Sequence, residues 1–177
     1  MPPALADALP GTRYHQRMKT FLIQRVLFPL ARIYWKVVRP KTFGVKGVVV
    51  RPGDERVLLV RHAYGDTAIW SLPGGGYRPR SEAAHEAVAR EIHEELGLAV
   101  REPVLLGEYK TQAQGKRDTV AIFSCPVGDD VDEAAFTLND ELAEARWFTP
   151  AEVEALDRTY PITTRSLELY REHDPSR

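Results

Sequence analysis

Three glutamates, Glu91, Glu94 and Glu95, lie close together in the segment from Ser81 to Leu98. The spacing of apolar residues predicts one helix here, and at about 100° per residue the three side chains project from one patch. Like charges three and four residues apart repel one another on a helix, unless a cation neutralises them. Because hard divalent ions prefer carboxylate oxygens, the patch predicts a site for Mg²⁺, Mn²⁺ or Ca²⁺.

A solvated surface is the simpler explanation of a glutamate-rich helix, and the charge pattern alone leaves both interpretations open. The loop before the helix favours a binding site, because Gly74–Gly76 allow the backbone to approach another group closely. A glycine-rich turn that leads into a helix is also an arrangement that binds phosphate. Arg90 stands four residues from both Glu86 and Glu94, so its guanidinium can hold a carboxylate in position.

A longer pattern links the glycine loop to the glutamates. Gly76 is followed after five residues by Glu82, and Glu82 after seven residues by "REIHEELGL", which begins at Arg90. This pattern resembles the signature of the Nudix hydrolases, with Ile92 and Leu98 at its aliphatic positions. The likeness extends over residues 42–160, through "WSLPGGG" and "EARWF".

The resemblance implies hydrolysis of a nucleoside diphosphate linked to another group, by attack of water on phosphorus. The roles that it implies are metal ligation by Glu91, Glu94, Glu95 and the Gly76 carbonyl, bracing of the loop by Glu82, and orientation of a glutamate by Arg90. Mg²⁺ or Mn²⁺ suits this chemistry because it screens an anionic pyrophosphate from an acidic site. Such an ion also lowers the pKa of the attacking water.

The catalytic base is open among three glutamates. Glu94 is the first choice within the helix. Glu141 and Glu144, just before the pattern "ARWF", are the alternatives outside it, and both are equally well explained as surface acids.

Four residues are candidates for substrate contact, each with a structural alternative. Arg61 ends a strand pattern, where it could reach a phosphate or simply be exposed. Trp70 could stack on a base, although aromatic residues in strands more often pack in the core. Lys116 and Arg117 belong to a hairpin tip, where charges usually serve solubility. No marker outside the signature identifies the substrate, so nucleoside triphosphates and nucleotide sugars are both open.

The elements that must position these residues alternate between strands and helices. Strands are expected at 43–50, 56–62, 103–111, 118–127 and 143–148, and residues 68–76 are expected to be a short strand that runs into a glycine-rich turn. Helices are expected at 81–98, 150–156 and 161–173. The first two strands flank Pro-Gly-Asp and are expected to form a hairpin. The pattern predicts an α/β (α+β) fold with mixed strand directions. The resemblance implies a Nudix-type α/β/α sandwich with a mixed sheet.

The chain divides into an N-terminal helical arm, residues 1–41, and a Nudix domain with a C-terminal helix, residues 42–177. The arm has a net charge of +7, whereas the domain has 16 basic and 24 acidic residues. Residues 17–38 predict an amphipathic helix with a basic face, kinked or split at Pro29. We expect it to pack on the domain or, more specifically, to form a homodimer contact. Association with a membrane surface is the alternative.

Two other functions compete with hydrolysis. A catalytically silent Nudix-fold module would sense a nucleotide or bind a partner, but it would be expected to lose the glutamates of the signature. A prenyl diphosphate isomerase would need a cysteine at the site, and the single cysteine, Cys125, falls inside a strand pattern. One cysteine fits a reducing compartment, so a cytoplasmic location is expected. The partner is expected to be a small nucleoside diphosphate derivative, with no specific nucleic acid.

Overall fold

The structure is a computed structural model and describes residues 40–51, 53–112, 117–128, 131 and 135–173. Its elements are β1 (Lys41–Val48), β2 (Val57–His62), β3 (Trp70–Ser71), α3 (Ala84–Leu96), β4 (Val104–Thr111), β5 (Arg117–Ser124), β6 (Leu142–Phe148), α4 (Pro150–Glu154) and α5 (Pro161–His173). The segment expected to form the N-terminal helix lies outside the described residues. No helix in the described part of the chain is long and apolar enough to cross a membrane.

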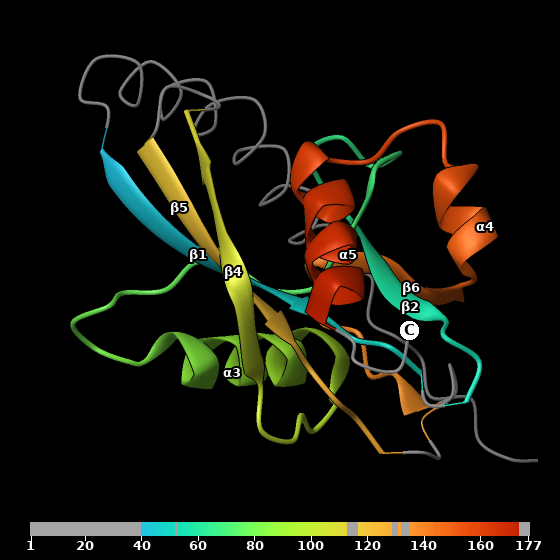
Figure 1. Cartoon of the computed structure of the whole chain (residues 1–177), viewed down its shortest axis with the longest axis horizontal. Helices are drawn as coiled ribbons and strands as arrows, with labels where there is room; N and C mark the ends of the chain where they lie inside the picture. The colour runs from blue at the N-terminus through green and yellow to red at the C-terminus, as the bar shows by residue number, and fades with distance from the viewer. Residues whose placement is uncertain (1–39, 52, 113–116, 129–130, 132–134, 174–177) are drawn as a thin grey trace, which may run out of the picture.

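The strands form two three-stranded sheets (Figure 1). In the first, with the order β1-β5-β4, β1 is parallel to β5 and β4 is antiparallel to β5. In the second, with the order β3-β2-β6, all pairs are antiparallel. The expectation of mixed strand directions is therefore confirmed, and it is met within the first sheet.

The expected hairpin of residues 43–50 and 56–62 is confirmed at its tip, where Val50 pairs antiparallel with Val57, but β1 and β2 belong to different sheets. Only a short antiparallel contact joins them, in which Leu58 N donates to Val49 O at 2.9 Å and Arg51 N donates to Arg56 O at 2.7 Å. The Pro-Gly-Asp turn thus reverses the chain locally. The main partner of β1 is instead β5, in which Arg117 lies opposite Lys41.

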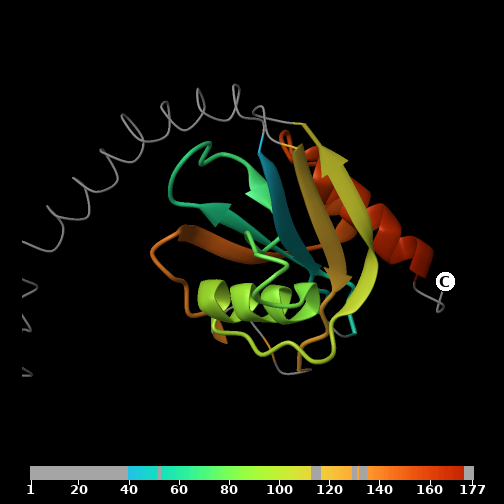
Figure 2. The same ribbon diagram turned by 90° about the vertical axis from the view of Figure 1, so that its left-hand side faces the viewer.

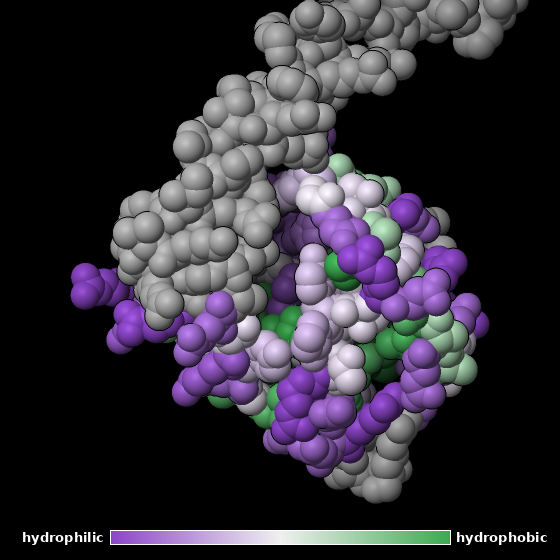
Figure 3. All heavy atoms as spheres, turned by 90° about the horizontal axis from the view of Figure 1, so that it is seen from above, coloured by the Kyte–Doolittle hydropathy of each residue, from purple (hydrophilic) through white to green (hydrophobic). Residues whose placement is uncertain are grey.

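Helices cover both sides of the sheets, with α3 on one side and α5 on the other (Figure 2). Successive side chains of β2 point to opposite faces of the sheet, so Leu58 and Val60 belong to one core cluster and Leu59 belongs to the other. Hydrophilic side chains dominate the described surface when the molecule is seen from above (Figure 3). The α/β/α sandwich expected from the resemblance is confirmed.

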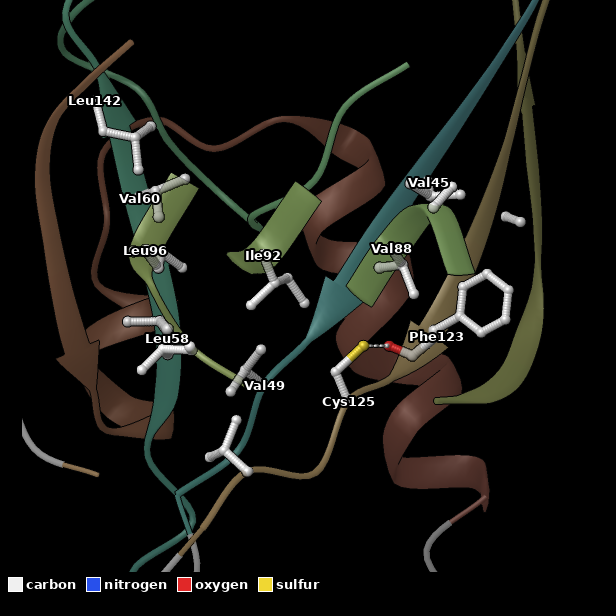
Figure 4. Packing of buried hydrophobic residues seen from close by; sticks show 14 of the residues in the cluster. Val45, Val49, Leu58, Val60, Val88, Ile92, Leu96, Phe123, Cys125 and Leu142 are labelled. Atoms are coloured by element: carbon white, nitrogen blue, oxygen red, sulfur yellow. Dashed lines mark hydrogen bonds between the residues drawn. The ribbon is translucent and has the colours of Figure 1, made fainter. Parts of the chain in front are cut away.

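The helix of the glutamates packs with one face into the first core. Val88, Ile92 and Leu96 are fully buried there and point toward β1 and β2 (Figure 4). α3 begins at Ala84, three residues later than expected, because Ser81 and Glu82 belong to a turn in which both amides donate to Arg78 O. The helix ends as expected before Gly97, which has a φ of 73° and so suits glycine.

Candidate active site

The carboxylates of α3 line a cavity of about 450 Å³. Because Ile92 and its neighbours anchor the helix in the core, the adjoining face holds the glutamates at the core's edge. The cavity wall also includes the glycine loop, the end of β2 and the loop before β6. Its residues include Glu91, Glu94, Glu95, Gly74–Gly76, Glu141, His62 and Tyr64. The structure thus brings the three α3 glutamates together with Gly76 and Glu141.

The glycine loop runs alongside β1 and is held by backbone hydrogen bonds. Val45 N donates to Gly75 O at 2.9 Å, and Tyr77 N donates to Phe43 O at 3.0 Å. Gly74 has a φ of 121°, and a Cβ there would lie 2.4 Å from Val45 O. A Cβ on Gly75 would lie 2.4 Å from Glu91 Oε2. The backbone of β1 therefore requires glycine at position 74, whereas a side chain at position 75 would displace the carboxylate of Glu91.

Gly76 differs, because within the described part of the chain a Cβ there would meet only Phe43 O, at 3.8 Å. A Gly76→Ala variant should therefore keep the melting temperature of the wild type. We expect its kcat/KM to fall at least about tenfold, because a methyl group would intrude where a substrate or metal must approach, and small misplacements at a reacting centre are costly. Thermal melting and steady-state kinetics check this. Full activity would mean that no external group comes close to Gly76.

Glu95 is a buried carboxylate, with only 4% of its surface exposed. Its Oε2 accepts a hydrogen bond from Gly74 N at 2.9 Å. Burial raises the pKa of Glu95, and the nearby charge of Lys46 opposes that shift. The carboxylate is thereby fixed against the loop through one of its oxygens.

Lys46 is a site residue that the sequence analysis missed. Its Nζ donates to Leu72 O at 2.8 Å and to Gly74 O at 2.6 Å, so it holds the loop from the side of β1. Burial lowers the pKa of Lys46, while the charges of Glu95 and Glu91 raise it. Lys46 and Glu95 thus bind the carbonyl and the amide of the same residue, Gly74. A lysine between valine and glycine within an apolar strand pattern was the available signal.

Arg90 links the loop to two of the glutamates. Its guanidinium donates to both carboxylate oxygens of Glu82, at 3.0 and 2.9 Å. One of its nitrogens, Nη1, lies 3.0 Å from Glu91 Oε1 and 3.0 Å from Glu94 Oε2. Burial raises the pKa of Glu91, and Arg90 opposes that shift. The turn before α3 brings Glu82 into reach, although it precedes Arg90 by more than two helical turns.

The donor types suit a hard divalent ion, but the side chains do not form a closed ligand set. Among the described residues, no three acidic, His or Cys side chains are arranged so that they could hold a metal ion. Glu91 and Glu94 turn toward Arg90, and Glu95 turns toward Gly74. Each protein contact engages one oxygen of its carboxylate. The residues therefore fit Mg²⁺ or Mn²⁺ in chemistry, and coordination would require side-chain rotation.

Glu141 and Glu144 lie in different surroundings. Glu141 lines the cavity, and its Oε2 accepts a hydrogen bond from Tyr64 Oη at 3.1 Å. Burial and the charge of Glu141 raise the pKa of Tyr64 to about 12. Glu144 instead lies opposite Arg61 in the β2–β6 ladder and binds it at 2.5 Å. Glu144 is not among the residues that line the cavity.

The four candidates for substrate contact do not gather at this cavity. Arg61 stacks over the ring of Trp70 at 5.6 Å, and Trp70 packs edge-on against Phe148 with ring centroids 4.7 Å apart. Arg117 lines a separate groove near the start of β1. Lys116 lies outside the described residues. Arg61 is thus held by Trp70 and Glu144, and Trp70 packs on Phe148, while contact of either residue with substrate stays a prediction.

Comparison with known proteins identifies the family. The model of the NUDIX domain matches residues 41–170. The chain therefore belongs to the Nudix family, and it is a Nudix hydrolase. A solved NUDIX hydrolase from Nitrosomonas europaea aligns with a TM-score of 0.61 and 26% identity, over 75% of this chain and 89% of that one.

Two curated relatives show the range within the family. A MutT-like protein from Streptomyces ambofaciens is 36% identical over 120 residues, which cover 67% of this chain and 71% of the relative. The NAD-capped RNA hydrolase NudC from Mycobacterium tuberculosis is 37% identical over 107 residues. That match covers 60% of this chain but only 33% of NudC. The likeness to NudC is thus limited to a third of its length.

Proposed function

We propose that this chain hydrolyses a pyrophosphate bond in a nucleoside diphosphate linked to another group, with Mg²⁺ or Mn²⁺ as its cofactor. The observation that carries the proposal is the gathering of Glu91, Glu94, Glu95 and Gly76 around one cavity. In the reaction, water adds to one phosphorus, the bridging P–O bond breaks, and two phosphate-bearing products leave. A bound divalent ion would screen the phosphate charges and activate the water.

In this proposal, Glu91, Glu94, Glu95 and the Gly76 carbonyl would hold the ion. Glu94 would also be the base, because its side chain is 55% exposed and Arg90 holds only its Oε2. Its other oxygen would then accept a proton from water. Glu141 is the second candidate, since it lies in the same cavity.

The remaining chain residues would position these groups. Arg90 would orient Glu91 and Glu94, and Glu82 would brace Arg90 from the loop. Glu144 is left out of the proposed machinery because its carboxylate is bound to Arg61 outside the cavity.

A catalytically silent binding module is the alternative, and the retained carboxylates argue against it. An isomerase that depends on a cysteine is also disfavoured. Cys125 is buried, and burial raises the pKa of its thiol to about 12, so it is neither exposed nor ionised at neutral pH.

A panel assay tests the proposed function. It presents nucleoside triphosphates, nucleotide sugars, dinucleotides and NAD-capped RNA with Mg²⁺ or Mn²⁺, and measures phosphate-bearing products. The last substrate is included because one relative is named for it. Hydrolysis that stops in chelator supports the proposal. Nucleotide binding without turnover of any substrate would favour the silent module.

Residues 1–39 of the N-terminal arm lie outside the described residues, whereas Lys41, which was assigned to the arm, begins β1. The arm is proposed to pack on the domain or on a second copy of the chain. Removing residues 1–39 should then cause aggregation or change the oligomeric state in gel filtration, because it exposes apolar surface. Liposome flotation with anionic lipid tests the membrane alternative. Salt-sensitive flotation of the full chain, lost on truncation, would replace the packing proposal. A cytoplasmic location is part of the same proposal.

A further inference from the structure

A second, larger cavity adjoins the glycine loop. It has a volume of about 1330 Å³ and shares His62 and Gly74–Gly76 with the cavity of the glutamates. Its walls are β1 and the loop that follows Gly76. Small-molecule pockets usually have volumes of about 300–1,000 Å³. This groove therefore has room for a substrate longer than one nucleoside diphosphate.

The groove is basic, although the rest of the domain is acidic. Lys41, Arg78 and Arg80 line it, and Asp118 is the one acidic side chain among its described lining residues. Asp118 accepts a hydrogen bond from Thr42 Oγ1 at 2.8 Å. Residues 42–177 as a whole have 16 basic and 24 acidic residues. The positive charge beside the candidate active site is thus a local feature.

The side chains of these three cations have no partner among the described residues. Most of the other arginines that the structure describes do: ion pairs hold Arg51, Arg56, Arg61, Arg90, Arg158, Arg165 and Arg171. Lys41, Arg78 and Arg80 are all exposed along one groove. Their charges are therefore available to an anionic ligand that extends away from the glutamates.

Two aromatic rings complete the groove, one from each wall. Phe43 of β1 is 38% exposed. Its ring meets that of Tyr77 edge-on, with centroids 6.2 Å apart and an interplanar angle of 71°. Proteins bind single-stranded nucleic acid with basic side chains along the sugar-phosphate backbone and with aromatic rings on which the bases stack.

We propose that this groove binds a single-stranded nucleotide chain, so that the substrate is the 5′ end of an oligonucleotide. The inference rests on the proposed function, because the terminal pyrophosphate bond would lie at the glutamates. Backbone phosphates would contact Lys41, Arg78 and Arg80, and a base would stack on Phe43 or Tyr77. Phosphate contacts carry no sequence information, so no specific sequence is required. The proposed substrate is thus an oligonucleotide, which is larger than the small nucleoside diphosphate derivative expected from the sequence.

The test compares kcat/KM for ATP with kcat/KM for a 5′-triphosphorylated hexaribonucleotide, with Mg²⁺ and over a range of salt concentrations. At low salt the kcat/KM for the oligonucleotide should exceed that for ATP at least about tenfold. This ratio should fall with added salt: its logarithm, plotted against the logarithm of the salt concentration, should have a slope of about −0.7 per phosphate contact. The double variant R78Q/R80Q should lose most of the preference. Arg101→Gln is the matched control, because Arg101 is exposed, is not in the groove and has no side-chain partner among the described residues.

Three results would overturn the inference: equal kcat/KM for both substrates, a preference insensitive to salt, or the same preference in R78Q/R80Q. Hydrolysis of ATP without any preference leaves the proposed function intact, so the two failures are distinguishable. If neither substrate is hydrolysed, fluorescence anisotropy with a labelled hexaribonucleotide tests whether the groove binds the oligonucleotide. Tighter binding by the wild type than by R78Q/R80Q supports the groove, and equal binding contradicts it.

Discussion

Glu94→Gln is expected to lower kcat at least about 100-fold, which is typical of losing a positioned general base. The melting temperature should stay close to that of the wild type, because the Glu94 side chain is 55% exposed and, among the described residues, only Arg90 binds it. Gln keeps the volume of the side chain but loses the charge that would bind an ion or accept a proton. Steady-state kinetics with Mg²⁺ and thermal melting measure the two effects.

Glu108→Gln on β4 is the control for this variant. Glu108 is similarly exposed, and its charge partner Lys110 is 3.6 Å away, so its loss should change neither activity nor stability. Full turnover by Glu94→Gln would remove Glu94 from the proposed site. Wild-type turnover that persists in chelator would contradict the metal requirement as well.

Much of the site could be predicted from the sequence because it depends on local geometry. Glu91, Glu94 and Glu95 belong to one helix, so their spacing alone places them on one patch. The buried stripe that includes Ile92 fixes which side of the helix faces the core. Local periodicity therefore predicted both the patch and its position at the edge of a packed face.

Long-range pairing could not be predicted in the same way. The hairpin of residues 43–50 and 56–62 was expected because the two strand patterns are close in sequence. The main partner of β1 is instead β5, where Lys46 lies opposite Ile122 across 76 positions of the chain. A turn signal specifies that the chain reverses, but not which strands share a sheet.

The difference between Glu141 and Glu144 is also a matter of strand register. β6 begins at Leu142, so Glu141 lies just before the strand and lines the cavity. Glu144 lies within the strand, directly opposite Arg61 of β2. Opposite charges at such positions attract each other, so the pair gives both residues a structural role. Neither position could be assigned before the register of β2 and β6 was known.

Lys46 is the clearest residue that the sequence could not assign. Its partners, the carbonyls of Leu72 and Gly74, follow it by 26 and 28 residues. Leu72 O and Gly74 O belong to the segment that runs alongside β1, and that contact was not expected. A charged residue in a strand is normally placed on the solvent side, so its inward role depends on a loop that only the structure shows.

Lys46→Met should therefore have a large effect on both stability and activity. Met preserves much of the length of the side chain but cannot donate to Leu72 O or Gly74 O. Each buried carbonyl left without a partner costs about 1–3 kcal/mol. For a domain of this size, 1 kcal/mol lowers the melting temperature by about 2–4 °C. We expect a drop of at least about 4 °C and, because the loop would loosen against Glu95, a fall in kcat of at least about tenfold.

Two further variants distinguish the loss of the Lys46 hydrogen bonds to the loop from a general effect of removing a positive charge. Lys110→Met on β4 removes an exposed lysine whose nearest carboxylate is 3.6 Å away, and it should match the wild type. Lys46→Arg keeps both the charge and the donors, so it should recover part of the activity that Lys46→Met loses. The kinetics are measured below the melting temperature of each variant, so that unfolding does not contribute. If Lys46→Met is as stable and as active as the wild type, the two hydrogen bonds to the loop do not hold the site together, and the glycine loop must be positioned by its backbone contacts with β1 alone.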